Sequence, residues 1–428
     1  MKYSAIENKL FIENRKRFAK KLKPNALAVF NSNDVMPTNA DGTMAFVQNA
    51  DLFYLSGIDQ EESVLVIFPD AKNEAHREIL FLKETNEHIA VWEGHKYTKE
   101  EAFQTSGIKT VHWMSQFKTV FKTLMNQCEQ VYLNTNEHTR ALIQVETRDA
   151  RFLNWCKESY PLHTYMRSAP VMHDLRVVKS KIEIDLIQEA CNITEKGFRG
   201  LLSFVKPGVW EYEVEAELIH EFVRNRSKGF AYGPIVASGK NATVLHYVDN
   251  NKQCKAGDVI LLDVAAEYAN YASDMTRCLP VSGKFNKRQR KVYDAVLRMK
   301  REAMRMMKVG NTLEKLNKEV GELMQEELVK LGLLKNSAIK KQDPANPLYK
   351  KYFMHGTSHY IGLDVHDVGN FSRPFEDGMV LTCEPGIYIP EENLGIRLEN
   401  DILITKKGPI DLMSTIPIEA EEIEALMN

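Results

Sequence analysis

The chain has two parts that differ in the pattern of apolar and polar positions. In the first part, short continuous apolar runs alternate with stretches of helical spacing. The runs are ALAVF (26–30), SVLVIFP (63–69) and REILFL (77–82), and the helical stretches are KEEAFQTSG (99–107) and MSQFKTVFKTLMNQ (114–127). Such runs indicate buried strands. Alternation of strands with helices is typical of an α/β domain.

The pattern changes across residues 161–180. A segment with two prolines and a basic run there precedes a long amphipathic stretch. We place the domain boundary here, with one domain over 1–172 and a second over 173–428. In the second part, helical stretches alternate with strand-rich segments that carry acids and histidines. The predicted helices cover 181–204, 211–227, 285–308 and 312–332, and 334–350 is predicted to be a loop.

Composition narrows the class of protein. With 428 residues, 44% hydrophobic and 27% charged, the chain has an ordinary globular composition and is long enough for two or three domains. The formal net charge is −2, so the overall charge of the chain does not attract nucleic acid or an anionic membrane. The N-terminus lacks an apolar signal region, and no apolar run approaches a membrane span. Six scattered cysteines without CxxC spacing indicate reduced thiols in a cytoplasmic protein.

Titratable side chains are concentrated in MHGTSHYIGLDVHDVG (354–369), which holds three histidines and two aspartates. Apolar residues are interleaved with them, so part of this stretch is expected to be buried. Buried imidazoles and carboxylates need partners. His355 and His359 are four residues apart, so on a strand they would share one face.

Two acids lie on either side of a plausible turn in DVILLDVAAEYANYASDMTR (258–277). A hairpin centred between Tyr268 and Ala269 would place Asp263 and Asp274 directly opposite each other, with Cβ atoms about 5 Å apart. Like charges in that position repel, unless one acid is protonated or a cation lies between them.

The same arrangement recurs in TCEPGIYIPEENLGIRLEND (382–401), where Glu384 and Glu399 flank the turn PEENLG. Either acid alone is equally consistent with a strand edge, and a lone histidine with a satisfied core residue. Two pairs of opposed, mutually repelling acids in one domain favour a common explanation. Four carboxylates with one imidazole are a suitable ligand set for two divalent cations. Oxygen-rich ligation with one nitrogen favours Mn²⁺, Fe²⁺, Co²⁺ or Zn²⁺ over a soft-metal site.

These blocks resemble the pita-bread metallopeptidases, and within them the Xaa-Pro aminopeptidase (aminopeptidase P) and prolidase group. The resemblance rests on LHYVDN (245–250), LLDVAAEYANYASDMTR (261–277), MHGTSHYIGLDVHDVG (354–369), LTCEPGIYI (381–389) and GIRLEND (395–401). The stretch NADLFYLSGIDQEESVLVIFPD (49–70) is similar to the creatinase-type N-terminal domain that precedes the catalytic domain in these enzymes. The implied fold is an α+β pita-bread catalytic domain preceded by an α/β creatinase-type N-terminal domain.

The resemblance implies a site with two divalent ions per chain, with Mn²⁺ expected first and Co²⁺, Zn²⁺ or Fe²⁺ as alternatives. Asp263 would bind one ion, Asp274 and Glu399 would bridge both, and His359 and Glu384 would complete the second. All five residue types are present.

The same resemblance assigns the surrounding side chains. Glu384 would move the proton of the attacking water, with His246, His355, His366 and Arg397 as further catalytic residues. Substrate would be bound by Tyr388, His246, His366 and Arg397. Two alternatives stay open. His355 is either a substrate or metal-supporting contact or a purely structural hydrogen bond, and Arg397 either steers substrate or supports Glu399.

The implied activity is release of the N-terminal residue from peptides with proline in second position, by a metal-bridged hydroxide. Proline-containing peptides are the expected partners, with no nucleic acid or membrane, and a homodimer or higher homo-oligomer is expected. The main alternative is prolidase, which cuts Xaa-Pro dipeptides. The spacing of 25 positions from His359 to Glu384 favours the aminopeptidase. A non-catalytic peptide-binding module and a phosphate-ester hydrolase fit less well, since all five ligands are present and clustered arginines are not.

Overall fold

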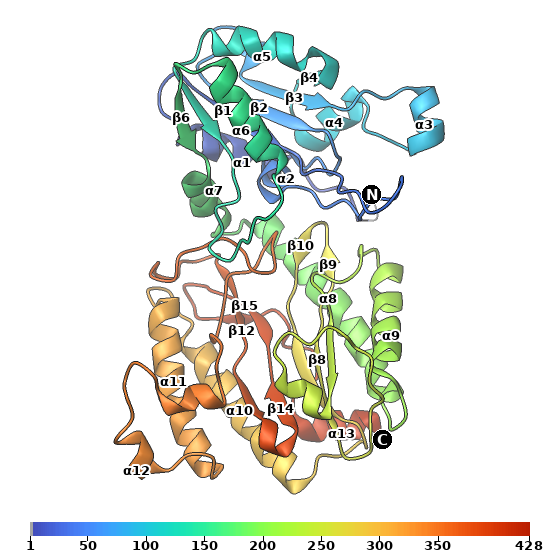
Figure 1. The fold of residues 1–428 in the computed structure, drawn as a ribbon, viewed down its shortest axis with the longest axis vertical. Coiled ribbons are helices and arrows are strands. Elements are labelled where there is room, and N and C mark those ends of the chain that lie inside the picture. The colour runs from blue at the N-terminus through green and yellow to red at the C-terminus, as the bar shows by residue number, and fades with distance from the viewer. Residues whose placement is uncertain (1–2) are drawn as a thin grey trace. The chain divides into compact units, whose positions relative to one another are not determined.

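The computed structural model describes residues 3–428. It divides into two compact units, one formed by Ala5–Arg176 and the other by Val177–Asn428 with a short N-terminal stretch ending at Ser4. Figure 1 labels most of the helices and strands of both units. The boundary that the sequence predicts, after residue 172, lies inside the last helix of the first unit, α7 (Ala169–Arg176).

The N-terminal unit is built on one six-stranded sheet in the order β4-β3-β2-β1-β5-β6. Strand β2 runs antiparallel to both of its neighbours, and the other pairs are parallel. All six residues of β1 are buried because the strand is central and covered on both faces. The three predicted strands are confirmed as β1–β3. The strands are β1 (Ala26–Asn31), β2 (Val64–Ile67), β3 (Glu78–Leu82), β4 (Thr110–Trp113), β5 (Gln130–Leu133) and β6 (Thr164–Arg167).

Helices cover this sheet. Phe117, Phe121 and Leu124 of α5 and Cys156 of α6 pack on an apolar sheet face that includes Val29 and its neighbours. The two helices predicted from the sequence correspond to α4 and α5. The helices are α1 (Lys9–Ala19), α2 (Ala50–Ser56), α3 (Glu87–Glu93), α4 (Lys99–Ser106), α5 (Phe117–Met125), α6 (Arg148–Ser159) and α7.

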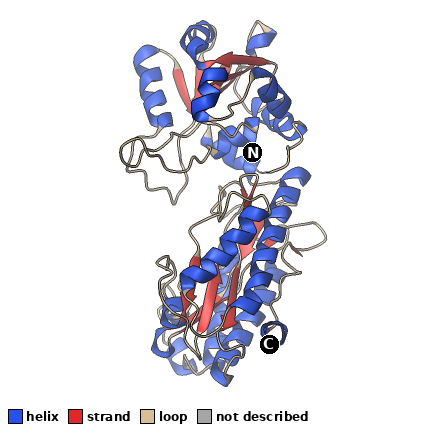
Figure 2. Cartoon of the chain, turned by 90° about the vertical axis from the view of Figure 1, so that its right-hand side faces the viewer, coloured by secondary structure: helices blue, strands red, loops and turns tan. Residues whose placement is uncertain are grey.

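In the C-terminal unit, long helices lie across the strands, as Figure 2 shows. The four predicted long helices are all present, and Ser180 and Glu183 cap the first of them reciprocally. The segment predicted to be a loop, 334–350, contains a one-turn helix and reaches a 3₁₀ turn at Leu348–Lys351, which is too little structure for a periodic signal. The helices are α8 (Lys181–Phe204), α9 (Glu211–Arg224), α10 (Lys287–Met306), α11 (Leu313–Lys330), α12 (Asn336–Ile339) and α13 (Ala420–Met427).

The strands of this unit form small sheets in the orders β11-β8-β7, β12-β15-β16, β13-β14 and β10-β9. An isolated bridge between Thr276 and Glu399 joins the first two of these sheets. The two acid-bearing hairpins therefore meet at this bridge. The strands are β7 (Ile235–Ser238), β8 (Val259–Asp263), β9 (Glu267–Tyr268), β10 (Tyr271–Ala272), β11 (Thr276–Pro280), β12 (Val380–Cys383), β13 (Gly386–Ile389), β14 (Leu394–Arg397), β15 (Asn400–Leu403) and β16 (Ile410–Asp411).

None of the helices in residues 3–428 combines the length and apolar character that crossing a membrane requires.

Candidate metal centre

The first hairpin differs in register from the prediction. Asp263 pairs with Thr276, not with Asp274, and Tyr268 pairs with Tyr271. The turn consists of two residues of positive φ, Ala269 (54°) and Asn270 (66°), so its centre lies one residue later than predicted and every partner shifts by two. A shift of two residues preserves the face of each side chain. Asp263 and Asp274 thus lie diagonally on the same face.

The second hairpin has the predicted register. Cys383 pairs with Asn400, and Gly386 pairs with Arg397. The β12–β15 and β13–β14 ladders continue in one register. Glu384 and Glu399 lie between these two ladders and therefore face each other.

The segment that carries His359 is not a strand, which corrects the expectation for residues 355–359. It is tied to β12 instead, where the His359 N–H donates to Thr382 Oγ1 (3.2 Å) and the Thr382 N–H donates to the His359 carbonyl (2.9 Å). His359 Nδ1 lies 2.9 Å from the Tyr360 carbonyl. Because a carbonyl only accepts, Nδ1 carries a proton, and Nε2 is the nitrogen that would bind a metal ion after losing its own proton. That Nε2 atom lies 3.4 Å from Asp274 Oδ2 and 3.8 Å from Glu384 Oε1.

Three of the five predicted ligands converge tightly. One ligand atom each from Asp274, His359 and Glu399 lies within 4.8 Å of the others, and all three residues are buried. Glu399 Oε2 accepts a hydrogen bond from Thr276 Oγ1 (2.7 Å), whereas Glu399 Oε1 is buried without a hydrogen-bond partner among the described residues. A buried, unpaired carboxylate oxygen is costly. The donor set and this oxygen fit a divalent cation.

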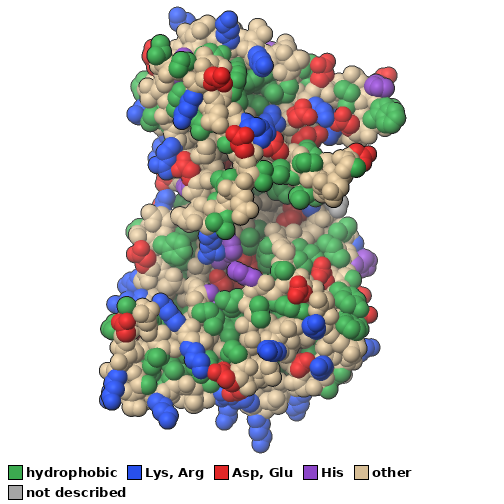
Figure 3. All heavy atoms as spheres, in the orientation of Figure 1, with side chains coloured by type: hydrophobic (Ala, Val, Ile, Leu, Met, Phe, Trp, Pro, Cys, Tyr) green, Lys and Arg blue, Asp and Glu red, His purple; other side chains and the backbone are tan. Residues whose placement is uncertain are grey.

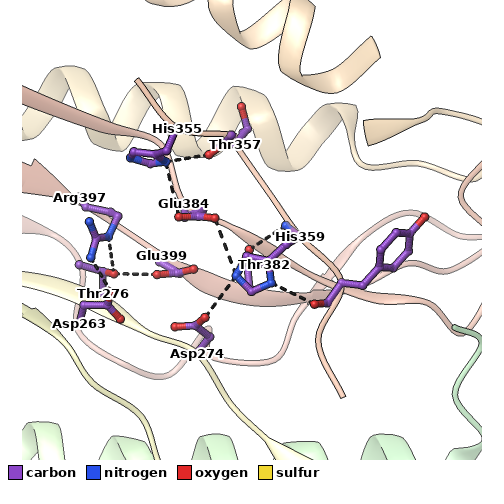
Figure 4. A network of polar contacts seen from close by, with 12 residues as sticks. Asp263, Asp274, Thr276, His355, Thr357, His359, Thr382, Glu384, Arg397 and Glu399 are labelled. Carbon is purple, nitrogen blue, oxygen red and sulfur yellow. Dashed lines mark hydrogen bonds and ion pairs between the residues drawn. The ribbon is translucent and has the colours of Figure 1, made fainter. Parts of the chain in front are cut away.

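The other two predicted ligands adjoin this group, as the network in Figure 4 shows. Glu384 lies beside His359, and Asp263 is linked to Asp274 through Tyr232, whose Oη is 2.6 Å from an oxygen of each. A phenol has one proton to donate, so a second proton or a cation is needed between these two carboxylates. All five predicted ligands belong to one buried polar network.

Burial and mutual repulsion shape the charges of the network. Burial raises the pKa of Glu384 to about 7, against the opposing charges of His359 and Arg397. Burial, reinforced by Asp274 and Glu384, raises the pKa of Glu399 well above its ordinary value. Burial alone would lower the pKa of His359, but its interactions with Asp274 and Glu384 raise it to about 9. Without cations, the site therefore favours protonated acids and a charged imidazole.

These shifts predict how the stability of the metal-free protein depends on pH. The pKa of Glu384 is about 7 in the folded chain against an ordinary 4.5, so its contribution to stability is complete below pH 4.5 and is lost as the pH rises through 7. We expect Tm to fall by on the order of 5 °C across this window. Thermal melts at fixed ionic strength check this. Glu384→Gln should reduce the fall, and identical slopes for the two proteins would contradict the prediction.

The remaining predicted residues fall into two groups. His355 Nε2 and Arg397 Nη1 each lie 2.8 Å from Tyr388 Oη, and Tyr388 has no exposed surface. Tyr388 links these two side chains, and its predicted role in substrate binding stays a prediction. The second group holds His246, which is exposed, and His366, which is half-buried with its ring 4.5 Å from that of His359. Histidine and acidic side chains are visible together on this face in Figure 3.

Arg397 is buried, and each guanidinium nitrogen has a protein partner. Nε donates to Thr276 Oγ1 (2.9 Å), Nη1 to Tyr388 Oη, and Nη2 to Asp263. Of the two roles left open for Arg397, these contacts favour support of the carboxylates. Burial and the charge of Arg397 lower the pKa of His355 to about 3, so His355 is neutral.

Sequence reasoning missed four residues of the network. Three of them lie two positions from a predicted ligand and so share its side of the chain: Thr276 follows Asp274, Thr382 precedes Glu384, and Asp401 follows Glu399. Asp401 Oδ2 accepts the Asp274 backbone N–H at 3.1 Å. The period-two rule could have found these three. The fourth, Tyr232, comes from a separate segment, and no local pattern marks it.

Two models of known protein families match the chain. Residues 185–406 match the model of metallopeptidase family M24, and residues 11–132 match that of the aminopeptidase P N-terminal domain. The Xaa-Pro aminopeptidase of Escherichia coli (strain K12) is 33% identical over 437 aligned positions, covering 99% of this chain and 98% of that protein.

Two solved structures extend the comparison. The Zn-substituted E. coli aminopeptidase P in complex with product superimposes with a TM-score of 0.88 at 32% identity and covers 99% of each chain. Aminopeptidase PepP of Pseudomonas aeruginosa superimposes with a TM-score of 0.90 at 29% identity, covering 99% of this chain and 98% of that one.

Proposed function

The chain belongs to metallopeptidase family M24, and from this premise we propose that it is a metal-dependent Xaa-Pro aminopeptidase, releasing the N-terminal residue of peptides whose second residue is proline. The expected fold class is confirmed. A pita-bread catalytic domain follows an aminopeptidase P-type α/β N-terminal domain. Peptides are the substrates of such an enzyme, and divalent metal ions are its cofactors.

One observation carries the proposal. Four carboxylates and one imidazole from separate segments converge in a buried network in which Glu399 Oε1 is left without a partner. We assign metal binding to Asp263, Asp274, His359, Glu384 and Glu399. Mn²⁺ is the proposed ion, because the donors are mostly carboxylate oxygens. When bound, a pair of divalent ions supplies a Lewis acid and a water whose pKa is lowered toward neutrality.

Glu384 is the proposed proton carrier. It takes the proton of the attacking water and delivers it to the proline nitrogen, because an amide anion is a poor leaving group. Its carboxylate lies between His355 (Nδ1 at 3.6 Å) and His359 (Nε2 at 3.8 Å), which restricts its movement.

The surrounding residues orient the reacting groups. His355 is held in place through both ring nitrogens, Nε2 by Tyr388 Oη, which Arg397 also contacts, and Nδ1 by the Gly356 carbonyl (2.8 Å). His246 and His366 are assigned to the substrate cleft, where an imidazole can donate to the scissile carbonyl oxygen. We further propose a cytoplasmic location and a homodimeric or larger assembly.

The chain-length preference tests this function against its alternative, prolidase. We expect kcat/KM for a Xaa-Pro-Xaa tripeptide to exceed that for the matching Xaa-Pro dipeptide by about tenfold or more when Mn²⁺ is present. Measuring both substrates in parallel, with and without Mn²⁺, checks this. The opposite preference would identify a prolidase. Hydrolysis of neither peptide would refute both activities and favour a peptide-binding module.

A further inference from the structure

The first turn of α9 contains a buried acid that the mechanism does not use. Glu211 has no exposed surface, and its carboxylate accepts five hydrogen bonds. Oε1 accepts from the Ser238 N–H (2.7 Å), Ser238 Oγ (2.7 Å) and Asn241 Nδ2 (3.1 Å). Oε2 accepts from Tyr247 Oη (2.7 Å) and the Lys252 N–H (3.0 Å).

All five donors come from one stretch of chain. We call residues 239–252 the His246 loop; Ser238 immediately precedes it, and Lys252 ends it. The carboxylate therefore joins both ends of the loop to each other and to α9. Such bonds to an ionised, buried acceptor are stronger than neutral ones, because the charge is not shared with water.

The His246 loop also packs against a β-strand. A Cβ atom on Gly395 of β14 would lie 1.9 Å from the Ala242 carbonyl oxygen, so the loop packs directly on that strand. Beyond Ala242 the loop rises into solvent, where Val244 and Val248 are 53% and 60% exposed. Tyr247 and Asn250 turn inward instead and are only 8% and 3% exposed.

His246 directly precedes this anchored tyrosine. It is exposed, and it lies close enough to His355 for its charge to act on that residue, although burial is the larger influence there. His246 is thus one residue away from Tyr247, whose hydroxyl donates to Glu211.

We propose that Glu211 is a positioning residue that holds His246 over the substrate site by joining the two ends of the His246 loop. This inference rests on the proposed function for the role of His246, but the structural connection does not depend on it. Glu211 itself touches neither substrate nor metal ligand, so it acts only through the loop.

Glu211→Gln is a sharp test, because an amide cannot replace the carboxylate in either orientation. One amide atom is an NH₂ group, which would face the backbone N–H of either Ser238 or Lys252, and neither can accept. Glu217→Gln is the matched control, since Glu217 is an exposed acid on the same helix. The metal content of both variants should equal that of the unsubstituted enzyme.

Two measurements separate positioning from general damage. Hydrogen exchange should be about tenfold faster in the His246 loop of Glu211→Gln than in the control, because a charge-assisted set of bonds is lost. In the presence of Mn²⁺, Glu211→Gln should lower kcat/KM for a Xaa-Pro-Xaa tripeptide about tenfold when His246 is present, and less than about twofold when combined with His246→Ala.

The outcomes are distinct. An equal loss of kcat/KM with and without His246 would show a merely structural role for Glu211 and overturn the proposal. Unchanged hydrogen exchange in the His246 loop of Glu211→Gln would also overturn it. If Glu211→Gln does not fold, Tyr247→Phe removes a single bond to the same carboxylate and should show the same pattern at smaller amplitude. An inactive unsubstituted protein would refute the proposed function, and hydrogen exchange would still decide whether Glu211 holds the loop.

Discussion

Glu384→Gln should lower kcat for a Xaa-Pro-Xaa tripeptide by about 10²–10⁴-fold while the protein stays folded, because an amide cannot carry the proton from water to the proline nitrogen. The substitution keeps the size of the side chain and one oxygen that can contact a metal. KM should therefore change much less than kcat. Steady-state kinetics in saturating Mn²⁺, with circular dichroism as a check of folding, measure both quantities.

Glu391→Gln is the control for this substitution. It lies on the turn of the same hairpin and is exposed, where it pairs with Lys351 (2.8 Å). It should have near-normal kinetics. Hydrolysis by Glu384→Gln at a similar rate would refute the role of Glu384 in proton transfer.

Glu399→Gln should have opposite effects on function and on stability. Loss of this proposed metal-binding carboxylate should reduce activity at least about 100-fold, since even partners of metal ligands are worth 10- to 100-fold. In the metal-free protein, the same change removes an acid whose ionisation is opposed by burial and by the charges of Asp274 and Glu384. Tm of the metal-free variant should rise by on the order of 5 °C at pH 8.

Differential scanning calorimetry of metal-free and Mn²⁺-loaded samples distinguishes the two effects. The unsubstituted protein should gain Tm on addition of Mn²⁺, and Glu399→Gln should gain much less, because a ligand stabilises only the state that binds it. A metal-free Glu399→Gln protein that melts below the unsubstituted one would contradict the view that these acids are held together against their repulsion.

Such a site is a local conflict between folding and function. The chain brings four acids together in a buried network, where the cations beside them are Arg397, bonded to Asp263, and the imidazole of His359, next to Asp274 and Glu384. Similar local violations of folding rules are expected at functional sites rather than elsewhere. The unpaired Glu399 Oε1 is the clearest instance among the described residues of this network.

The sequence predicted the second hairpin better than the first, for a physical reason. The turn between β13 and β14 contains proline, which restricts φ, and asparagine, which tolerates positive φ. Both residues mark turns, so the centre of this turn could be located from the sequence. The first turn is Ala269–Asn270, and alanine at positive φ has no sequence signature. The face of each acid was nevertheless predicted, because an error of two residues does not turn a strand over.

Long-range contacts were beyond local patterns. Tyr232 lies about thirty positions before its first carboxylate partner, and the donors to Glu211 lie at the end of β7 and on the loop that follows it. The long helices were predictable because their apolar periodicity extends over several turns and their ends carry caps, as at Ser180. The irregular segment around His359 was mistaken for a strand because its alternating apolar residues imitate the period of two.

The central claim is that the four acids and His359 hold a pair of catalytic divalent ions. Titrating metal-stripped protein with Mn²⁺, while bound metal and tripeptide hydrolysis are measured in the same sample, tests it most directly. The account predicts negligible hydrolysis at the start and full activity as bound metal approaches about two ions per chain. Full activity in protein that contains no metal would contradict it.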